Sequence, residues 1–178
     1  MKYVALLRGI NVGKGARVPM KALKGLLEGL GFSSVVTYLN SGNVVFDSEL
    51  GASELMQLIE VELERAFGEK IPTLVKTSKE IIEIAASIPS EWASNASEQT
   101  YVAYLFCDVD TPGLVSELPI KRQFMSVYHT PGAIVWNIKR ENYNRSQITK
   151  IAGHSSYARM TTRNVNTARK LAALCAES

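Results

Sequence analysis

The sequence predicts an α+β fold built from two small units, and three observations support this prediction. The chain has 178 residues, of which 46% are hydrophobic and 21% charged, a composition that can bury a core. Short apolar runs alternate with segments whose apolar residues recur every three or four positions, which is typical of strands alternating with amphipathic helices. This order of elements restarts near residue 78, so we expect one unit over 1–77 and a second over 78–178.

The first unit is expected to contain four strands and two helices. Short runs rich in apolar and β-branched residues predict the strands, at 2–7, 34–39, 44–46 and 71–76. One helix is expected from Pro19, which suits a first helical turn, to Gly31, which suits a helix end. Another is expected over 53–67, with Leu55 and Ile59 on its inner face. The order β-α-β-β-α-β is that of the split βαβ, or ferredoxin-like, fold.

The second unit shows the same order without a last strand. Ser78 is expected to cap a short helix, and the polar stretch 89–99 is expected to be a linker. Strands are then expected at 101–106, 123–129 and 133–138, and helices at 111–118, 144–151 and 163–176. We therefore expect two ferredoxin-like units packed together, the second lacking its last strand, as an architectural pseudo-repeat.

Composition excludes several classes of protein. No apolar run approaches the about 20 residues that a bilayer span needs, and the N-terminal segment has no small-residue cleavage site of a signal peptide. The two cysteines, Cys107 and Cys175, are too few for a disulfide scaffold or a zinc site and are expected to pack in the interior. The sequence indicates no metal site and identifies no cofactor, and we expect a cytoplasmic protein.

Charge is distributed unevenly along the chain, although the net charge is only +3. Residues 1–27 carry six basic side chains and no acidic one, and residues 139–170 carry eight basic side chains and the single acid Glu141. The region 28–118 holds fifteen of the seventeen acids. One interpretation is solvated faces and helix-dipole complementarity. The other is that the two basic ends meet and form a site for an anion.

The loop after the first strand is one candidate segment. It reads Arg-Gly-Ile-Asn-Val-Gly-Lys-Gly at 8–15, and glycines there let backbone N–H groups face an anion at a helix entrance. The spacing is not that of a P-loop, because only three residues separate Gly9 from Gly13. The alternative is a flexible connection that needs positive φ. The segment Asn-Ser-Gly-Asn at 40–43 has hairpin-turn chemistry, and the sequence leaves open whether it approaches the loop.

A further candidate segment precedes the last helix, at 161–167. Thr161 or Thr162 is expected to cap this helix, which places Arg163 in its first turn. A cation there opposes the helix dipole, and a bound anion would remove the conflict by pairing with the guanidinium and the backbone N–H groups. The alternative is an ordinary cap with a solvated arginine.

Familiar catalytic patterns are weak in this sequence. His129 lies beside a predicted turn, where a role in the turn is expected. His154, in Gly-His-Ser-Ser-Tyr at 153–157, has the residue type for acid–base work near neutral pH, but no acidic neighbour in the sequence to orient it. The sequence contains no paired carboxylates and no nucleophile elbow, so no reaction is assigned.

Four motifs occur in a fixed order along the chain: Leu-Leu-Arg-Gly-Ile-Asn-Val-Gly at 6–13, Val-Pro-Met at 18–20, Thr-Tyr-x-x-Ser-Gly-Asn-Val at 37–44 and Thr-x-Arg-Asn-x-Asn-Thr at 161–167. On these motifs the chain closely resembles a bacterial family known as domain-of-unknown-function family 1697. Two departures are Lys14, where the family commonly has glycine, and Val165, where it often has an aromatic residue. The resemblance implies paired ferredoxin-like units and brings no established activity.

These observations favour a binding protein or enzyme with a basic, asparagine-rich pocket for a small phosphorylated or nucleotide-like ligand. The pocket would be formed by the N-terminal loop and the start of the C-terminal helix. The expected ligand-binding residues are Arg8, Gly9, Asn11, Gly13, Ser41, Asn43, Arg163, Asn164 and Asn166. Two alternatives remain open: nucleic-acid binding on a sheet face, and a partner-binding protein without a pocket.

Overall fold

The computed structural model describes residues 1–177, so the last residue of the expected second range lies outside the described residues. It divides into two compact units. Met1–Ile82 together with residues 171–177 form the first unit, and Glu83–Lys170 form the second. The expected ranges 1–77 and 78–178 stay a prediction. No helix among the described residues has the length and apolar character needed to cross a membrane.

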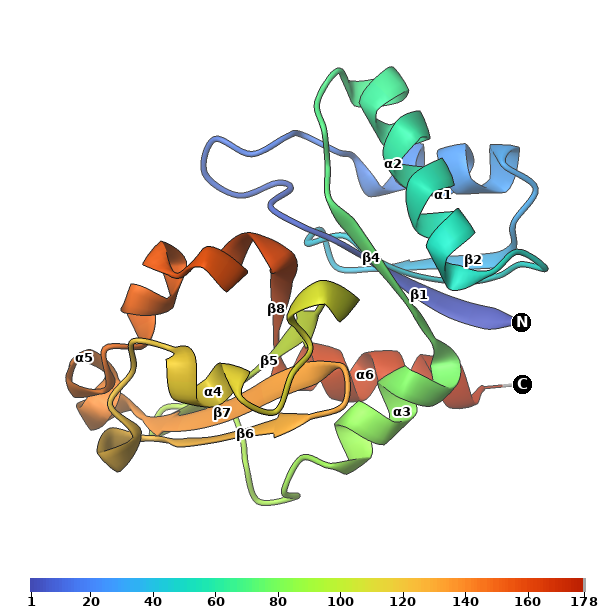
Figure 1. The fold of residues 1–178 in the computed structure, drawn as a ribbon. Coiled ribbons are helices and arrows are strands. Elements are labelled where there is room, and N and C mark those ends of the chain that lie inside the picture. Colours follow the sequence, from blue (N-terminus) through green and yellow to red (C-terminus); the bar gives the residue numbers. More distant parts are fainter. Residues whose placement is uncertain (178) are drawn as a thin grey trace. The chain divides into compact units, whose positions relative to one another are not determined.

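In the first unit, residues 1–77 form one four-stranded antiparallel sheet with two helices (Figure 1). Residues 78–82 and 171–176 of this unit belong to two further helices, whose other residues are in the second unit. The elements of residues 1–77 are β1 (Lys2–Leu7), α1 (Met20–Gly29), β2 (Ser33–Tyr38), β3 (Asn43–Asp47), α2 (Ala52–Phe67) and β4 (Thr73–Thr77). The strand order is β2-β3-β1-β4. One sheet face, with Tyr3, Ala5 and Phe46, packs with residues of α1 and α2 in the core of this unit. The opposite face carries Val4 and Leu6, which are also buried.

The second sheet repeats this arrangement with the strand order β6-β7-β5-β8. The elements after β4 are α3 (Ser78–Ala86), β5 (Glu98–Leu105), α4 (Leu114–Glu117), β6 (Ser126–Thr130), β7 (Ala133–Lys139), α5 (Tyr143–Ser146), β8 (Met160–Asn164) and α6 (Val165–Ala176). Five 3₁₀ segments lie between them, at 107–109, 122–124, 140–142, 148–153 and 155–159. One face, with Ala103 and Trp136, packs against residues of α4 and the 148–153 segment.

The expectation that the second unit lacks its last strand is wrong. Residues 160–164 form β8, which pairs antiparallel with β5 and places Arg163 opposite Val102. The last helix therefore begins at Val165 rather than at Arg163. Hydrogen bonding to β5 makes residues 160–164 a strand despite the helical spacing of the residues that follow. The sequence did not indicate this strand, because β8 is too short and too polar to show a strand pattern of its own.

The helix expected over 144–151 is interrupted. α5 ends at Ser146, and Gln147 has a left-handed backbone (φ 57°). From Ile148 the chain continues as 3₁₀ turns. A left-handed non-glycine residue ends an α-helix, so this side of the second sheet is covered by short turns where the first sheet has the long helix α2.

The cap of α3 is Thr77, not Ser78. The Glu80 N–H donates to Thr77 Oγ1 at 3.2 Å, and the Thr77 N–H donates to the Glu80 carboxylate at 2.8 Å. This reciprocal pair is a capping box. The Thr-x-x-Glu spacing at 77–80 already carried this signal in the sequence.

The two cysteines differ in their surroundings. Cys175 is buried in α6 as expected, and burial raises the pKa of its thiol to about 11. Cys107 is exposed, so the expectation that it packs in the interior is wrong. It begins the 107–109 segment, just after the buried end of β5.

Candidate functional site

The loop that follows β1 turns back on itself through left-handed residues. Gly9 (φ 71°), Asn11 (φ 56°) and Gly13 (φ 50°) all have positive φ, which glycine and asparagine tolerate best. A Cβ on Gly15 would lie 1.9 Å from the carbonyl oxygen of Gly9, so the two ends of the loop are in close backbone contact. The positive φ expected of this loop is therefore confirmed.

Asn11 joins this loop to the turn between β2 and β3. Its Nδ2 donates to the carbonyl oxygens of Val18 at 2.8 Å and Asn40 at 2.7 Å, and its Oδ1 accepts from the Val18 N–H at 2.9 Å. Both amide hydrogens are used in these contacts. A hydrogen bond from a ligand to this side chain would therefore fall on the second lone pair of Oδ1.

The turn at 40–43 lies against the end of β1, which answers the question that the sequence left open. The Leu7 N–H donates to the Gly42 carbonyl at 2.8 Å. Asn43 is fully buried, and its Nδ2 donates to the Tyr38 carbonyl at 2.8 Å and to Ser41 Oγ at 3.0 Å. Packing of β1 beside β3 thus brings the two candidate segments of the first unit together.

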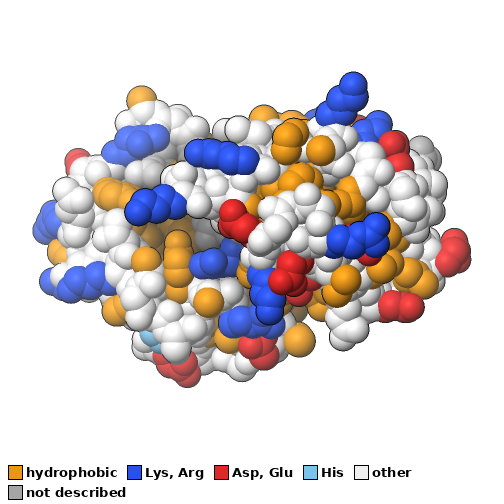
Figure 2. Space-filling model, turned by 90° about the horizontal axis from the view of Figure 1, so that it is seen from above, with side chains coloured by type: hydrophobic (Ala, Val, Ile, Leu, Met, Phe, Trp, Pro, Cys, Tyr) orange, Lys and Arg blue, Asp and Glu red, His pale blue; other side chains and the backbone are white. Residues whose placement is uncertain are grey.

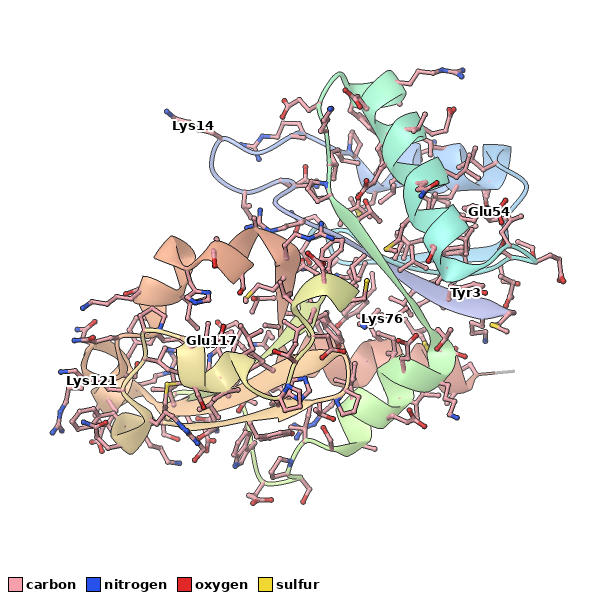
Figure 3. All side chains as sticks on the ribbon, in the orientation of Figure 1. Tyr3, Lys14, Glu54, Lys76, Glu117 and Lys121 are labelled. Atoms are coloured by element: carbon pink, nitrogen blue, oxygen red, sulfur yellow. The ribbon has the colours of Figure 1, made fainter. Side chains whose placement is uncertain are left out.

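Three cations belong to this part of the first unit. Arg8 is half-buried at the end of β1, and Arg17 donates from Nη2 to the Gly13 carbonyl at 3.1 Å. Lys14 is exposed and extends away from the loop (Figure 3). We call the predicted site residues of this unit the loop cluster: Arg8, Gly9, Asn11, Gly13, Ser41 and Asn43. The cluster combines positive charge with irregular backbone.

The remaining predicted residues lie where β8 passes into α6. The Asn164 Oδ1 accepts from the Asn166 N–H at 2.8 Å, so Asn164 caps the helix. The expectation that Thr161 or Thr162 caps it is wrong, because the helix begins at Val165 and the residue directly before it is Asn164. The Asn164 Nδ2 donates to Ser94 Oγ at 2.8 Å, which holds the cap to the segment before β5.

Arg163 is a buried cation, with 7% of its surface exposed. Its Nη1 donates to Thr161 Oγ1 at 2.8 Å and to the Thr162 carbonyl at 2.9 Å. Burial lowers the pKa of the guanidinium to about 10, and the nearby Tyr104 acts in the opposite direction. We call Arg163, Asn164 and Asn166 the strand–helix cluster. This cluster belongs to the second unit, and the loop cluster belongs to the first.

The two histidines have different partners. His129 Nε2 lies 2.7 Å from Asp110 Oδ1, and Asp110 Oδ2 accepts from the Gly132 N–H at 2.8 Å. Asp110 thus fixes His129 and the β6–β7 turn, in line with the role expected for His129. His154 Nδ1 accepts from the Ser156 N–H at 3.2 Å. Within residues 1–177, no group of three or more His, Cys, Asp or Glu side chains is placed to hold a metal ion.

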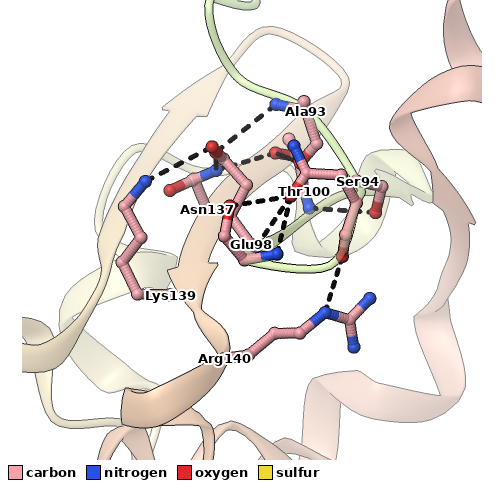
Figure 4. A network of polar contacts seen from close by, with 9 residues as sticks. Ala93, Ser94, Glu98, Thr100, Asn137, Lys139 and Arg140 are labelled. Carbon is pink, nitrogen blue, oxygen red and sulfur yellow. Dashed lines mark hydrogen bonds and ion pairs between the residues drawn. The ribbon is translucent and has the colours of Figure 1, made fainter.

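A polar network around buried Asn137 was not anticipated from the sequence (Figure 4). Asn137 Nδ2 donates to the Glu98 carboxylate and, at 2.9 Å, to Thr100 Oγ1. Thr100 Oγ1 donates to the Ala93 carbonyl at 2.7 Å, and Lys139 Nζ lies 3.3 Å from Glu98 Oε1. The hydrogen bond from Asn137 is the largest cause that lowers the pKa of Glu98. The network fastens the polar linker to the second sheet.

A pocket of about 420 Å³ on the second sheet is the main feature that sequence reasoning missed. Its lining includes Gln99 and Tyr101 of β5, Trp136 of β7, Tyr143 of α5 and Tyr157 of the 155–159 segment. We call it the aromatic pocket. All of its lining residues belong to the second unit. The aromatic residues were visible in the sequence, but the interrupted helix that leaves space above them was not.

The fold and the two clusters together define a two-unit α+β protein with polar, basic segments at the ends of its sheets. Residues 1–136 match the family model described as protein of unknown function DUF1697. The match covers most of the chain, so the protein belongs to this family, as its motifs indicated. No curated protein matches the chain.

A solved structure supports the fold. The chain is similar to the conserved bacterial protein SP0830 from Streptococcus pneumoniae, with a TM-score of 0.84 and 22% sequence identity. The similarity covers 98% of this chain and 98% of that chain. The arrangement of two four-stranded antiparallel sheets with their helices is therefore shared over the full length of both chains.

Proposed function

We infer that this protein binds a small anionic ligand, phosphorylated or nucleotide-like, through its basic, asparagine-rich clusters. The observation that carries this proposal is the burial of Arg163, which lowers the pKa of its guanidinium to about 10. Desolvation of a cation costs free energy that a nearby anion offsets. Guanidinium groups also bind phosphate and carboxylate groups with two parallel hydrogen bonds.

The loop cluster supports the same chemistry. Residues 1–27 carry no acidic side chain, so Arg8 and its neighbours act on a ligand without competing carboxylates from that segment. Figure 2 shows a face on which basic side chains lie among acidic and apolar ones. Asn11 fixes the loop that follows Arg8 and carries Lys14, and asparagine side chains can orient a ligand without adding charge. That one ligand uses both clusters stays a prediction.

Thermal unfolding in the presence of inorganic phosphate and of ribose 5-phosphate tests this proposal. Both probes are anions, and neither carries an aromatic ring that would direct it to the aromatic pocket instead. A ligand at 100 times its Kd stabilises the folded state by about 2.7 kcal/mol, which raises the midpoint of unfolding. We expect both probes to raise it in the wild-type protein. Arg163→Ala and Arg8→Ala are expected to reduce the rise, and the matched change Arg65→Ala, at an exposed site on α2, to leave it intact.

Arg163→Lys separates charge from geometry. A lysine keeps the positive charge but has no planar fork, so it should restore only part of the effect if the ligand is held by two parallel bonds. The proposal fails if neither probe shifts the midpoint, or if Arg65→Ala reduces the shift as much as Arg163→Ala does. Comparing Arg8→Ala, Arg163→Ala and the double variant shows whether the two residues contribute to one binding event.

The strand order supports a finer description of the fold. In both sheets the first strand of the unit pairs antiparallel with the third and the fourth, and the second pairs with the third. This is the pairing expected of a split βαβ unit, so we propose that both units are ferredoxin-like.

Nucleic-acid binding on a sheet face stays an alternative prediction. Recognition of single strands on a sheet needs exposed aromatic residues for base stacking. In the first unit Tyr3 of β1 is 4% exposed and Phe46 of β3 is 0% exposed, so the aromatic residues of these two strands belong to the core. This burial argues against base stacking on the first sheet.

A further inference from the structure

The two sheets each carry an aromatic pair at the same place. Tyr3 lies opposite Phe46 across β1 and β3, with ring centroids 6.0 Å apart and an interplanar angle of 31°. Tyr101 lies opposite Trp136 across β5 and β7, with centroids 6.1 Å apart and an angle of 30°. The residues two positions on, Ala5 and Ala103, are fully buried in both units. The pairs therefore occupy equivalent positions.

The two pairs differ in how they are covered. In the first unit Phe32 stacks on Phe46 with centroids 4.8 Å apart, and the Tyr3 hydroxyl donates to the Leu50 carbonyl at 2.9 Å. Leu50 lies two residues before α2, so this hydrogen bond holds Tyr3 by the start of that helix. In the second unit the corresponding helix ends at Ser146 and is followed by 3₁₀ turns. The pair here lines the aromatic pocket.

The walls of the aromatic pocket are apolar and its rim is accessible. Ile148 and Ile151 of the 148–153 segment line it, together with Ile138 of β7. At the surface Tyr143 and Tyr157 are 36% and 40% exposed. A volume of about 420 Å³ lies in the range typical of small-molecule sites. The space that α2 fills in the first unit is here open to a ligand.

We propose that the aromatic pocket binds a neutral purine ring, as in a purine nucleoside. Tyr101 lies beside the buried Trp136, with 30° between the two rings, and provides an aromatic face on which a heteroaromatic ring stacks. The aliphatic walls exclude water from the faces of that ring. A base attached to a sugar fits an open pocket, because the sugar stays at the rim beside Tyr143 and Tyr157.

Two polar lining residues make a purine the favoured ring. Gln99 lies two positions before Tyr101 on β5, and its carboxamide both donates and accepts hydrogen bonds, which matches the paired donor and acceptor on the edge of adenine. Thr162, on β8, is another polar residue that lines the pocket. No Asp, Glu, Lys or Arg is among the lining residues, so the ring that binds is uncharged.

The pocket is separate from the proposed anion site. Thr162 pairs with Ala103, which faces the same side as the pocket, whereas Arg163 pairs with Val102 on the opposite side of the sheet. Consecutive side chains of a strand point to opposite faces. The two sites thus use opposite faces of the sheet, and the success or failure of adenosine binding does not decide the anion proposal.

Fluorescence titration with adenosine tests this assignment. The chain has two tryptophans, so Trp92→Phe leaves Trp136 as the reporter inside the pocket. We expect a saturable change in its emission. Loss of the stacking ring in Tyr101→Leu, and loss of the amide in Gln99→Ala, should each weaken binding by about tenfold or more. The matched variant Gln57→Ala, at an exposed position of α2, should leave the Kd unchanged.

Equilibrium dialysis of adenosine against the wild-type protein provides a second measurement that needs no substitution. No binding by dialysis overturns the proposal, as does an unchanged Kd in both Tyr101→Leu and Gln99→Ala when circular dichroism shows both to be folded. An adenine oligonucleotide that binds about tenfold more tightly than adenosine would also overturn it, since the occupant would then be a single-stranded nucleic acid. Ribose 5-phosphate is expected not to compete with adenosine.

Discussion

The Leu7 N–H donates to the carbonyl of Gly42 at 2.8 Å, and the Leu105 N–H donates to the carbonyl of Gly132 at 2.9 Å. Each leucine ends the first strand of its unit, and each glycine lies in the turn between the second and third strands. Both glycines have positive φ, 82° and 88°. The same backbone hydrogen bond thus closes the same corner of both sheets.

The next residues repeat the pattern. The Arg8 N–H donates to the Pro72 carbonyl at 2.9 Å, and the Phe106 N–H donates to the Arg159 carbonyl at 3.1 Å. Each acceptor directly precedes the fourth strand of its unit. The candidate anion-binding Arg8 therefore corresponds to Phe106 in the second unit. The repeat keeps the backbone hydrogen bond at this corner and has an aromatic side chain in place of a cation.

Gly42 is expected to be the least replaceable residue of the first corner. A Cβ there would lie 2.6 Å from the Leu7 Cβ and 2.9 Å from Ile10 Cδ1, at a φ of +82°. Strain and overpacking together should lower the free energy of unfolding by about 3 kcal/mol in Gly42→Ala. Gly31→Ala is the control, because Gly31 has a φ of +87° with nothing within 4 Å. It should cost about 1 kcal/mol in urea titrations; equal losses would contradict the packing argument.

Asn11 is expected to stabilise the loop cluster through its side chain. Asn11→Ala removes three hydrogen bonds, to Val18 and Asn40, and should lower the free energy of unfolding by about 2 kcal/mol. Asn40→Ala keeps the carbonyl that Asn11 contacts and should be nearly neutral. Urea unfolding followed by circular dichroism compares the two. A neutral Asn11→Ala would show that this side chain does not hold the loop.

The capping box of α3 distinguishes two adjacent residues. Thr77→Ala removes the hydroxyl that accepts from the Glu80 N–H and should lower the free energy of unfolding by about 1 kcal/mol. Ser78→Ala, one position later and inside the helix, should have little effect. Thermal unfolding of both variants checks this order of effects. The reverse order of effects would show that Ser78, and not Thr77, caps the helix.

The Asp108–Arg159 pair should make stability depend on pH in the acidic range. Arg159 donates to both carboxylate oxygens of Asp108, from Nε at 2.9 Å and Nη2 at 2.9 Å, and these bonds are the largest cause that lowers the pKa of Asp108. A carboxyl group with a lowered pKa stabilises the folded state above its unfolded pKa. This contribution is lost as the pH falls through the folded pKa.

Asp108→Asn should therefore lower the free energy of unfolding by about 0.5 kcal/mol at pH 7, a small value because both side chains are roughly half exposed and screened by solvent. The difference from the wild-type protein should disappear when the pH falls below the folded pKa of Asp108, and shrink in high salt. Urea titrations across the acidic range measure it. A difference that stays constant across this range would contradict the role given to the Asp108–Arg159 pair.

Most of the fold could be predicted because its elements carry strong periodic patterns. β1 is a short apolar run, and α2 is clearly amphipathic. The limits predicted for both from the sequence agree with the structure within one residue. β8 could not be predicted, because its residues alternate Met160 and Thr162 on one face with Thr161 and Arg163 on the other. Neither face is apolar enough to give a period of two.

The candidate sites depended on contacts that are distant in the sequence. The approach of Asn11 to Asn40 joins residues 29 positions apart, and the pair of His129 and Asp110 joins residues 19 positions apart. No local spacing indicates such pairs. Likewise, the aromatic pocket depends on the left-handed Gln147, whose conformation the helical pattern around it conceals.

The unequal surroundings of the two thiols make the chain suited to selective chemical labelling. A maleimide dye should attach to the exposed Cys107 in the native protein. Cys175 is shielded, and burial raises the pKa of its thiol to about 11, so little reactive thiolate is present near neutral pH. Cys175 is expected to react only when α6 detaches from the core. Counting modified thiols over time, with the dye in enough excess that labelling outpaces reclosing, therefore gives the opening rate of the C-terminal helix, and a fluorophore on Cys107 reports on the corner where β5 ends.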